Sequence, residues 1–396
     1  MDVGAAGRAG AAPPARTASP FPRPRDRPRP MTPSEIFLAA TPGLEPLLAD
    51  EARAAGFEGV AATPGGVTVT GGWAEVRRAN LELAGAGRVL ARVAEFPAVH
   101  LAQLDKRARK LDWAALLRGD VPVKVEATSR GSKIYHAGAA AQRIERAITD
   151  ATGAPLEGED PVRVLVRIER NLVTISVDTS GEPLHRRGFK EFVGKAPLRE
   201  TMAALFLRAC GWDGTRPLVD PMCGSGTILL EGAARATGLA PGRGRVFAWQ
   251  RLAPPELRQE AGPVPAARGD IPAILGFDRD DGAVRGATEN VARAGLSDVV
   301  TVSRAALSDL APPPGPPGLV LTNPPYGARI GKPGPLHGLY ATLGTVLKER
   351  FRGWEAGLVT SEPGLARTTG LTFTESGPPV PHGPLKIRLY RTGPLP

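Results

Sequence analysis

Residues 218–231 read Leu-Val-Asp-Pro-Met-Cys-Gly-Ser-Gly-Thr-Ile-Leu-Leu-Glu, and this stretch decides the fold of the second half of the chain. An apolar strand ends at Asp220, a turn containing Gly224 and Gly226 follows, and a helix runs on through Glu231. Glycines let the backbone approach a ligand closely, and a helix N-terminus presents free N–H groups. The stretch is therefore typical of a nucleotide-type cofactor site. It is neither a P-loop, which needs Gly-Lys-Ser/Thr, nor a complete Gly-x-Gly-x-x-Gly motif.

Strands and helices alternate on both sides of this stretch. A helix is predicted over 198–210, and strands are predicted over 217–220, 274–278, 299–303, 318–322, 355–360 and 385–390. The Pro- and Arg-rich segment 243–271 interrupts the pattern and is interpreted as an irregular insertion. The alternation predicts an α/β fold with an open, mostly parallel sheet and helices on both faces.

Two further strand ends carry polar residues. Asp278 is placed to accept hydrogen bonds from a ribose diol, and the alternative is that it caps the next helix. Asn323 is followed by Pro324, Pro325 and Tyr326, and the two prolines fix the backbone. The Asn323 side-chain oxygen and the Pro324 carbonyl can then accept hydrogen bonds from both N–H groups of an exocyclic amine, while Tyr326 stacks the base. The alternative is a rigid proline turn with no catalytic role.

The first half of the chain contains two smaller patterns. From 36 to 93 the order strand, helix, strand, helix, strand predicts a small α+β domain. From 97 to 178 we expect helices over 101–111 and 139–149 and strands over 121–128, 162–169 and 173–178. The predicted domains are a tail (1–34), two α+β domains (35–96 and 97–180) and the α/β domain (181–396).

Basic residues gather where the predicted domains carry loops or meet. Arg130, Lys133 and Tyr135 lie in one loop, and Arg186 and Arg187 lie in a linker. These residue types contact RNA phosphates and bases, so the five are predicted to bind RNA. The alternative is a solvated surface.

The first thirty residues hold six arginines and two aspartates among Ala, Gly and Pro. So little apolar surface cannot offset the entropy of ordering, and the tail is expected to be disordered. It is either a basic arm that touches RNA or, as we favour, an extension upstream of a start at Met31.

Composition excludes several classes of protein. A hydrophobic content of 42% supports a sizeable core, and two cysteines exclude both a disulfide framework and a multi-cysteine zinc site. No run of 18 apolar residues and no secretory signal is present, so we expect a cytoplasmic protein without a membrane partner. The net charge of +10 favours a polyanionic partner.

The three strand-end segments, in this order, resemble motifs I, II and IV of class I S-adenosylmethionine-dependent amino-methyltransferases. Residues 184–189 (Leu-His-Arg-Arg-Gly-Phe) and 196–201 (Ala-Pro-Leu-Arg-Glu-Thr) narrow the resemblance to RNA guanine-N2 methyltransferases with a THUMP domain. Residues 123–178 resemble THUMP, and 37–56 resemble the ferredoxin-like segment before it. The resemblance implies a Rossmann-like methyltransferase domain behind a ferredoxin-like and THUMP RNA-binding region.

The resemblance also implies a reaction and the residues that perform it. The reaction is methyl transfer from S-adenosyl-L-methionine to the N2 amine of a guanosine in 23S rRNA, with a tRNA acceptor stem as the alternative. The implied cofactor residues are Thr201, Asp220, Pro221, Cys223, Gly224, Ser225, Gly226 and Asp278. The implied target-base residues are Asn323, Pro324, Pro325 and Tyr326. No metal is expected, because a methylated amine loses its proton readily to water.

The sequence departs from the family pattern at two positions. Ala306 stands where an acidic residue would face the adenine amine, and Asp309 lies three residues later. His382 stands where Asn is expected before Gly383.

Other functions remain open from sequence. The Asn-Pro-Pro-Tyr segment also occurs in methyltransferases that act on DNA adenine or protein glutamine, which lack the module over 97–178. The missing acidic residue fits a non-catalytic RNA-binding assembly factor. A covalent cysteine mechanism is disfavoured, because Cys223 lies in the cofactor turn. The oligomeric state is left open.

Overall fold

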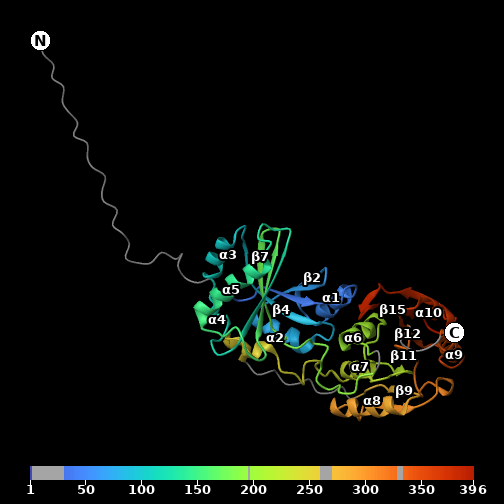
Figure 1. Ribbon diagram of the computed structural model, residues 1–396. Coiled ribbons are helices and arrows are strands. Elements are labelled where there is room, and N and C mark those ends of the chain that lie inside the picture. The colour runs from blue at the N-terminus through green and yellow to red at the C-terminus, as the bar shows by residue number, and fades with distance from the viewer. Residues whose placement is uncertain (2–30, 195–196, 259–269, 328–332) are drawn as a thin grey trace.

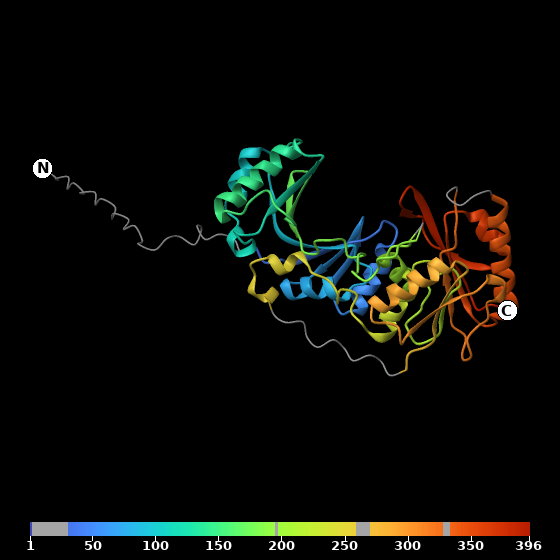
Figure 2. The same cartoon turned by 60° about the horizontal axis from the view of Figure 1, so that its bottom comes forward.

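The computed structural model describes residues 1, 31–194, 197–258, 270–327 and 333–396, which form two lobes lying side by side (Figures 1 and 2). Most of the predicted tail, 2–30, lies outside the described residues. Its last four residues do not belong to a tail, because Met31 packs into the core of the first lobe with 4% of its surface exposed. Among the described helices, none is both long and apolar enough to cross a membrane.

The first lobe is built on one seven-stranded sheet in the order β2-β3-β1-β4-β7-β6-β5. Its strands are β1 (Glu35–Ala39), β2 (Glu58–Thr63), β3 (Gly66–Thr70), β4 (Arg88–Pro97), β5 (Val123–Arg130), β6 (Val162–Glu169) and β7 (Leu172–Asp178). Its helices are α1 (Glu45–Ala54), α2 (Trp73–Glu82), α3 (Leu101–Ala108), α4 (Trp113–Leu116) and α5 (Ala137–Thr152). Strand β4 pairs with β1 on one side and β7 on the other. The predicted boundary at 96/97 therefore falls at the end of a strand that both α+β patterns share.

Alternating side chains explain why these strands form. In β6, Val162, Val164, Val166 and Ile168 are buried and the residues between them are more exposed. Because successive strand residues point to opposite faces, this alternation buries one face of the sheet against α5 and its neighbours.

The second lobe holds an eight-stranded sheet in the order β10-β9-β8-β11-β12-β15-β13, with β14 paired to β15. Its strands are β8 (Leu218–Asp220), β9 (Ile274–Asp278), β10 (Val300–Arg304), β11 (Leu319–Thr322), β12 (Glu355–Thr360), β13 (Phe373–Ser376), β14 (Val380–His382) and β15 (Leu385–Thr392). Its helices are α6 (Glu200–Ala209), α7 (Thr227–Thr237), α8 (Asp281–Arg293), α9 (Pro333–Arg350) and α10 (Pro363–Thr368), with 3₁₀ turns η2 (Ala248–Arg251), η3 (Pro255–Arg258) and η4 (Leu307–Asp309). Strands β10 to β12 are parallel, and β15 is antiparallel to β12.

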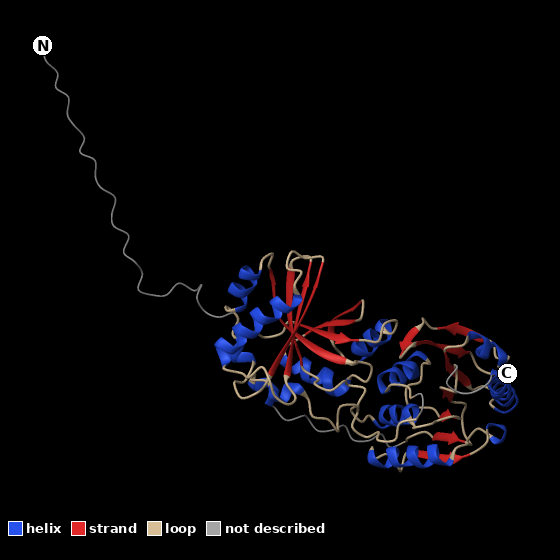
Figure 3. Cartoon of the chain, viewed as in Figure 1, coloured by secondary structure: helices blue, strands red, loops and turns tan. Residues whose placement is uncertain are grey.

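The order of these strands places the ligand site. The chain enters at β8, runs outward through β9 and β10, and returns to β11 on the other side of β8. Helices α6 and α7 lie between the sheet and the first lobe, and α9 and α10 lie on the far side (Figures 1 and 3). Ligands of open α/β sheets bind outside the carboxyl ends of the strands where the order reverses, which here is between β8 and β11.

The two lobes touch where α6 meets α1 and the loop at Gly85. The Arg208 guanidinium of α6 donates to the Asp50 carbonyl of α1 at 2.7 Å. Within the first lobe, the Glu51 carboxylate of α1 fixes that loop by accepting hydrogen bonds from the backbone N–H groups of Ala84 and Gly85, both at 2.8 Å. A Cβ added at Gly85 would meet the Leu205 side chain of α6 at 2.4 Å, so a larger residue here would require Leu205 to move. The described part of the insertion contributes as well, because its Trp249 N–H bonds Thr179 of the first lobe at 3.0 Å.

Candidate active site

The three strand-end segments meet at one edge of the second sheet. Strands β8 and β11 are adjacent and parallel, and the Thr322 hydroxyl donates to the Asp220 carboxylate at 2.9 Å. The Asp278 carboxylate at the end of β9 accepts a hydrogen bond from the Gly224 N–H at 3.1 Å. The structure therefore brings together the glycine turn, the strand-end acid and the segment that begins at Asn323.

Asp280, and not Asp278, caps the helix that follows β9. The Asp280 carboxylate accepts a hydrogen bond from Ala283 N–H at 2.8 Å and caps α8. Asp278 accepts from Gly224 and Asp280 instead, both of them backbone N–H groups. It stays partly exposed beside the glycine turn.

The glycine turn has the backbone conformation that only glycine adopts easily. Gly224 and Gly226 have φ of 52° and 79°, and a Cβ at Gly224 would enter open space in front of the sheet. Ser225 is buried, and its carbonyl accepts a hydrogen bond from Asn290 Nδ2 at 3.0 Å. The turn is therefore fixed by its hydrogen bond to α8 and faces open space at Gly224.

Burial controls the ionisation of the acids and thiols here. Burial of Asp220 raises the pKa of its carboxyl to about 7, and the nearby charge of Asp278 adds to the shift. Burial likewise raises the pKa of the Cys223 thiol well above its ordinary value. Cys223 packs beneath Gly276, where an added Cβ would meet its sulfur at 3.3 Å. A buried, protonated thiol is a poor nucleophile, which agrees with the disfavoured covalent mechanism.

The Asn-Pro-Pro-Tyr turn is supported from α9. The Tyr340 hydroxyl, fully buried, donates to the Pro325 carbonyl at 3.3 Å. Asn323 and Pro325 are half-buried and Pro324 is buried. Tyr326 has 6% of its surface exposed, its hydroxyl has no hydrogen-bond partner among the described residues, and burial raises its pKa to about 12.

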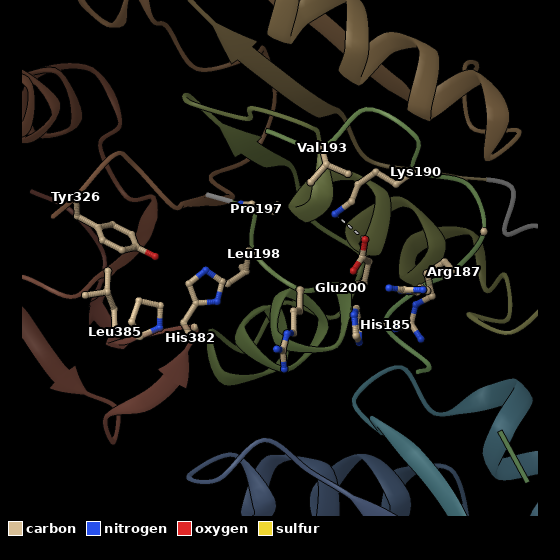
Figure 4. Close-up of a pocket in the computed structure, with 15 residues that line it drawn as sticks. His185, Arg187, Lys190, Val193, Pro197, Leu198, Glu200, Tyr326, His382 and Leu385 are labelled. Atoms are coloured by element: carbon tan, nitrogen blue, oxygen red, sulfur yellow. Dashed lines mark ion pairs between the residues drawn. The ribbon is translucent and has the colours of Figure 1, made fainter. Parts of the chain in front are cut away.

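A cavity of about 900 Å³ lies beside Tyr326. One wall is the linker that leads into α6, and the other is Tyr326 with the turn between β14 and β15. Figure 4 shows Tyr326, His382 and Leu385 on one side and Lys190, Glu200 and His185 on the other.

The structure corrects the predicted RNA contact at Arg187. This arginine has 6% of its surface exposed, and its guanidinium binds both Glu231 carboxylate oxygens at 3.1 Å. It also donates to the Ala84 carbonyl of the first lobe at 2.6 Å, so it joins the two lobes. Its motif could not reveal this, because the partner carboxylate lies on α7, 44 residues further along the chain. Arg186, by contrast, is exposed and pairs with Glu182 at 2.6 Å.

Two residues hold the linker, the segment between β7 and α6, to the rest of the second lobe. Lys190 pairs with Glu200 at 2.6 Å and donates to the Thr227 hydroxyl at 3.0 Å, at the start of α7. The fully buried Asn290 donates to the Phe192 carbonyl at 2.9 Å and accepts from the N–H groups of 191 and 192.

The remaining predicted residues lie at three places. Thr201 is buried in the first turn of α6, and Pro221 is buried next to Asp220. Tyr135, with 86% of its surface exposed, lies in the β5–α5 loop with the exposed Lys133, and the exposed Arg130 is the last residue of β5.

The β6–β7 turn lies against this loop and adds a cation that sequence reasoning missed. The Lys133 N–H donates to Asn171 Oδ1 at 2.8 Å, and Arg170 N–H donates to the Arg130 carbonyl at 3.2 Å. Arg170 and Asn171 both have positive φ, 49° and 66°, which marks a tight hairpin turn. We call Arg130, Lys133, Tyr135 and Arg170 the basic tip.

The site fits S-adenosylmethionine. The open space at Gly224 is a cradle that a side chain would fill, and two carboxylates lie beside it. Residues 223–226 would hold the amino-acid end of the methyl donor, and Asp278 would hold its ribose. Ala306 lies in the turn after β10, where the family pattern has an acidic residue facing the adenine amine. Asp309 does not take its place, because it is exposed and accepts a hydrogen bond from Ser308.

Fold and site together define a class I methyltransferase joined to an RNA-binding THUMP region. Family models match in chain order: an RlmL ferredoxin-like domain over 35–90, a THUMP domain over 98–178 and an RMKL-like methyltransferase domain over 187–376. The chain therefore carries a ferredoxin-like domain, a THUMP domain and a methyltransferase domain, and S-adenosylmethionine is the methyl donor that its methyltransferase relatives imply.

Individual curated proteins and solved structures are similar to this chain over most of its length. The chain is 37% identical over 366 residues to the ribosomal RNA large subunit methyltransferase K/L of Syntrophotalea carbinolica, covering 86% of this chain and 51% of that protein. The chain thus spans about half the length of the curated relatives it matches. A predicted N6-adenine-specific DNA methylase from Listeria monocytogenes is 29% identical, with a TM-score of 0.77 over 91% of this chain and 96% of that one. A putative methyltransferase complexed with SAH is 25% identical, with a TM-score of 0.78 over 92% and 99%.

Proposed function

We propose that this protein transfers a methyl group from S-adenosylmethionine to the exocyclic N2 amine of a guanosine in large-subunit ribosomal RNA. The observation that carries the proposal is the contact between the two motifs. The Thr322–Asp220 hydrogen bond of 2.9 Å joins the strand that presents Asn323 to the strand that leads into the glycine turn. An amine held by Asn323 would then lie at the same sheet edge as the methyl donor.

The Asn-Pro-Pro-Tyr turn would position the target amine, through one side chain and one backbone carbonyl. S-adenosylmethionine, when bound, supplies an electrophilic methyl group. The lone pair of a guanine N2 amine is delocalised into the ring, which makes the amine a poor nucleophile. The Asn323 side-chain oxygen and the Pro324 carbonyl would accept its two N–H groups, direct the lone pair and stabilise the positive charge that develops on nitrogen. The amine proton then leaves to water or to a fixed carbonyl.

Large-subunit rRNA is the substrate that the relatives favour. The curated relatives are named for it, and the THUMP region with its basic tip supplies cations and an exposed aromatic ring for RNA. Guanine N2 is proposed because it is an exocyclic amine and because the linker and entry-helix motifs resemble guanine-N2 enzymes. A cytoplasmic location follows from that substrate.

The test measures transfer of a labelled methyl group from S-adenosylmethionine to two RNAs. One is 23S rRNA transcribed in vitro, and the other is a pool of unmodified tRNA transcripts. The proposal predicts label in the rRNA alone. Label in tRNA alone would move the substrate to tRNA, and RNA binding without any transfer would favour an assembly factor.

A further inference from the structure

The cavity beside Tyr326 has a wall that methyl-donor binding does not explain. Residues of the linker and of the start of α6 form it, facing the turn between β14 and β15 (Figure 4). Its volume of about 900 Å³ is within the range of roughly 300–1,000 Å³ that is usual for small-molecule sites. It is large enough for a nucleotide.

Tyr326 points to a ligand in this cavity. Its side chain is buried, with 6% exposed, yet its hydroxyl has no hydrogen-bond partner among the described residues. Buried hydroxyl groups are normally bonded, and Figure 4 shows this one directed into the cavity. A polar atom of a ligand would complete it.

His382, the last residue of β14 before the β14–β15 turn, projects into the same cavity (Figure 4). An imidazole can both donate and accept a hydrogen bond and has a flat face for stacking. It is also one of the two positions at which this sequence departs from the family pattern. The turn therefore brings a second base-binding side chain opposite the linker.

The charge of the cavity is concentrated in one arginine. Lys190 and Arg187 are neutralised by Glu200 and Glu231 in buried ion pairs, and Arg186, which also lines the cavity, pairs with Glu182 at the surface. Among the charged lining residues that the structure describes, Arg199 has an exposed side chain that makes no hydrogen bond or ion pair, and only its backbone carbonyl is bonded, to the N–H groups of Met202 and Ala203. A free guanidinium at the edge of a nucleotide-sized cavity suits a phosphate.

We propose that this cavity binds the target nucleotide, with His382 and Tyr326 contacting the base and Arg199 contacting a phosphate next to it. The inference rests on the proposed function, because it takes RNA as the substrate. It assigns the linker a second role beyond joining the lobes: its end forms the wall against which the nucleotide is held.

Arg199→Gln tests the phosphate contact, with Arg352→Gln as the matched control. Arg352 is exposed and lies just before β12, at the opposite edge of the sheet from Tyr326. With the 23S transcript, Arg199→Gln should raise KM about tenfold, keep kcat within twofold and lower the salt slope of RNA binding by about 1. Arg352→Gln should behave as the wild type, and equal KM values and slopes for the two variants would refute the contact.

Filter binding of the transcript in the presence of S-adenosylhomocysteine separates this inference from the proposed function. A selective loss of binding in Arg199→Gln supports the cavity even if no methyl group is transferred, and in that case only the proposed function fails.

His382→Ala tests the base contact. It should lower kcat/KM for RNA at least tenfold and leave the affinity for S-adenosylhomocysteine within twofold, while His382→Asn restores most of the activity. Unchanged kcat/KM in His382→Ala would overturn the assignment of the β14–β15 turn to the base.

Discussion

Asp220 is a carboxyl group whose ionisation opposes folding. Its pKa rises from 3.8 in the unfolded chain to about 7 in the fold, because burial disfavours the charged form. Without a bound methyl donor, the protein therefore loses stability as the pH rises from about 4 to about 7, by an amount on the order of 2–4 kcal/mol.

Asp220→Asn should remove this loss of stability. The asparagine oxygen still accepts the hydrogen bonds of Thr322 and Met222, but it carries no charge at any pH. Thermal unfolding should show a gap in Tm, in favour of the variant, that widens from pH 5 to pH 8. Asp309→Asn, at an exposed carboxyl group, is the control and should show no such widening. A gap that is constant over this range would contradict the assignment.

Asn323 should matter for transfer and not for donor binding. Asn323→Ala removes one of the two proposed acceptors for the target amine, so methyl transfer should fall by at least about a hundredfold. Calorimetry should find the affinity for S-adenosylmethionine within twofold of the wild type. Full activity in Asn323→Ala would remove this residue from the mechanism.

At the scale of elements, the linker and α8 form one unit. Asn290 binds the backbone of 191 and 192, and a Cβ at Gly286 would come within 2.3 Å of the Phe192 ring. Asn290→Ala would leave those buried backbone groups unpaired and should cost about 2–4 kcal/mol in the free energy of unfolding.

Chemical denaturation measures that cost, with Thr288→Ala as the control. Thr288 is an exposed residue of α8, and its loss should change stability by less than about 0.5 kcal/mol. Equal stability of the two variants would show that the linker is not held by Asn290.

The elements that could be predicted are those with buried, periodic side chains. Strands β6, β9 and β12 begin and end where the sequence predicts, because each carries a continuous or alternating apolar pattern. Strands β2, β13 and β14 were missed. Strands β2 and β13 are exposed along most of their length and β14 has three residues, so pairing with a neighbour forms them and their own pattern does not.

At the scale of the whole molecule, the site residues that could be predicted are those placed by the local strand pattern, and the others depend on distant parts of the chain. The strand-end residues were predictable, because parallel strands bring their carboxyl ends to one edge. Arg187 was not, because its burial depends on Glu231 and on a carbonyl of the other lobe. The cavity was not predictable either, since its two walls lie far apart in the sequence.

The basic tip should set RNA affinity without touching the catalytic step. Arg130→Gln combined with Lys133→Gln removes two exposed cations, so RNA binding should weaken about tenfold and its salt dependence should decrease. Lys348→Gln with Arg352→Gln changes the net charge equally on the second lobe and should have no effect. Filter binding over a range of salt concentrations compares the RNA affinities of the two double variants. Equal losses of affinity would show that the basic tip acts only through the net charge of the protein and is not an RNA-binding site.

Nucleoside mass spectrometry tests the central claim most directly. The rRNA and tRNA fractions of a strain lacking this gene are digested and compared with those of the same strain carrying the wild-type or the Asn323→Ala gene. We predict that N2-methylguanosine in large-subunit rRNA is lost in the deletion strain, returns with the wild-type gene and stays absent with the variant. Loss of a different methylated nucleoside, or unchanged N2-methylguanosine in both fractions, would contradict the account.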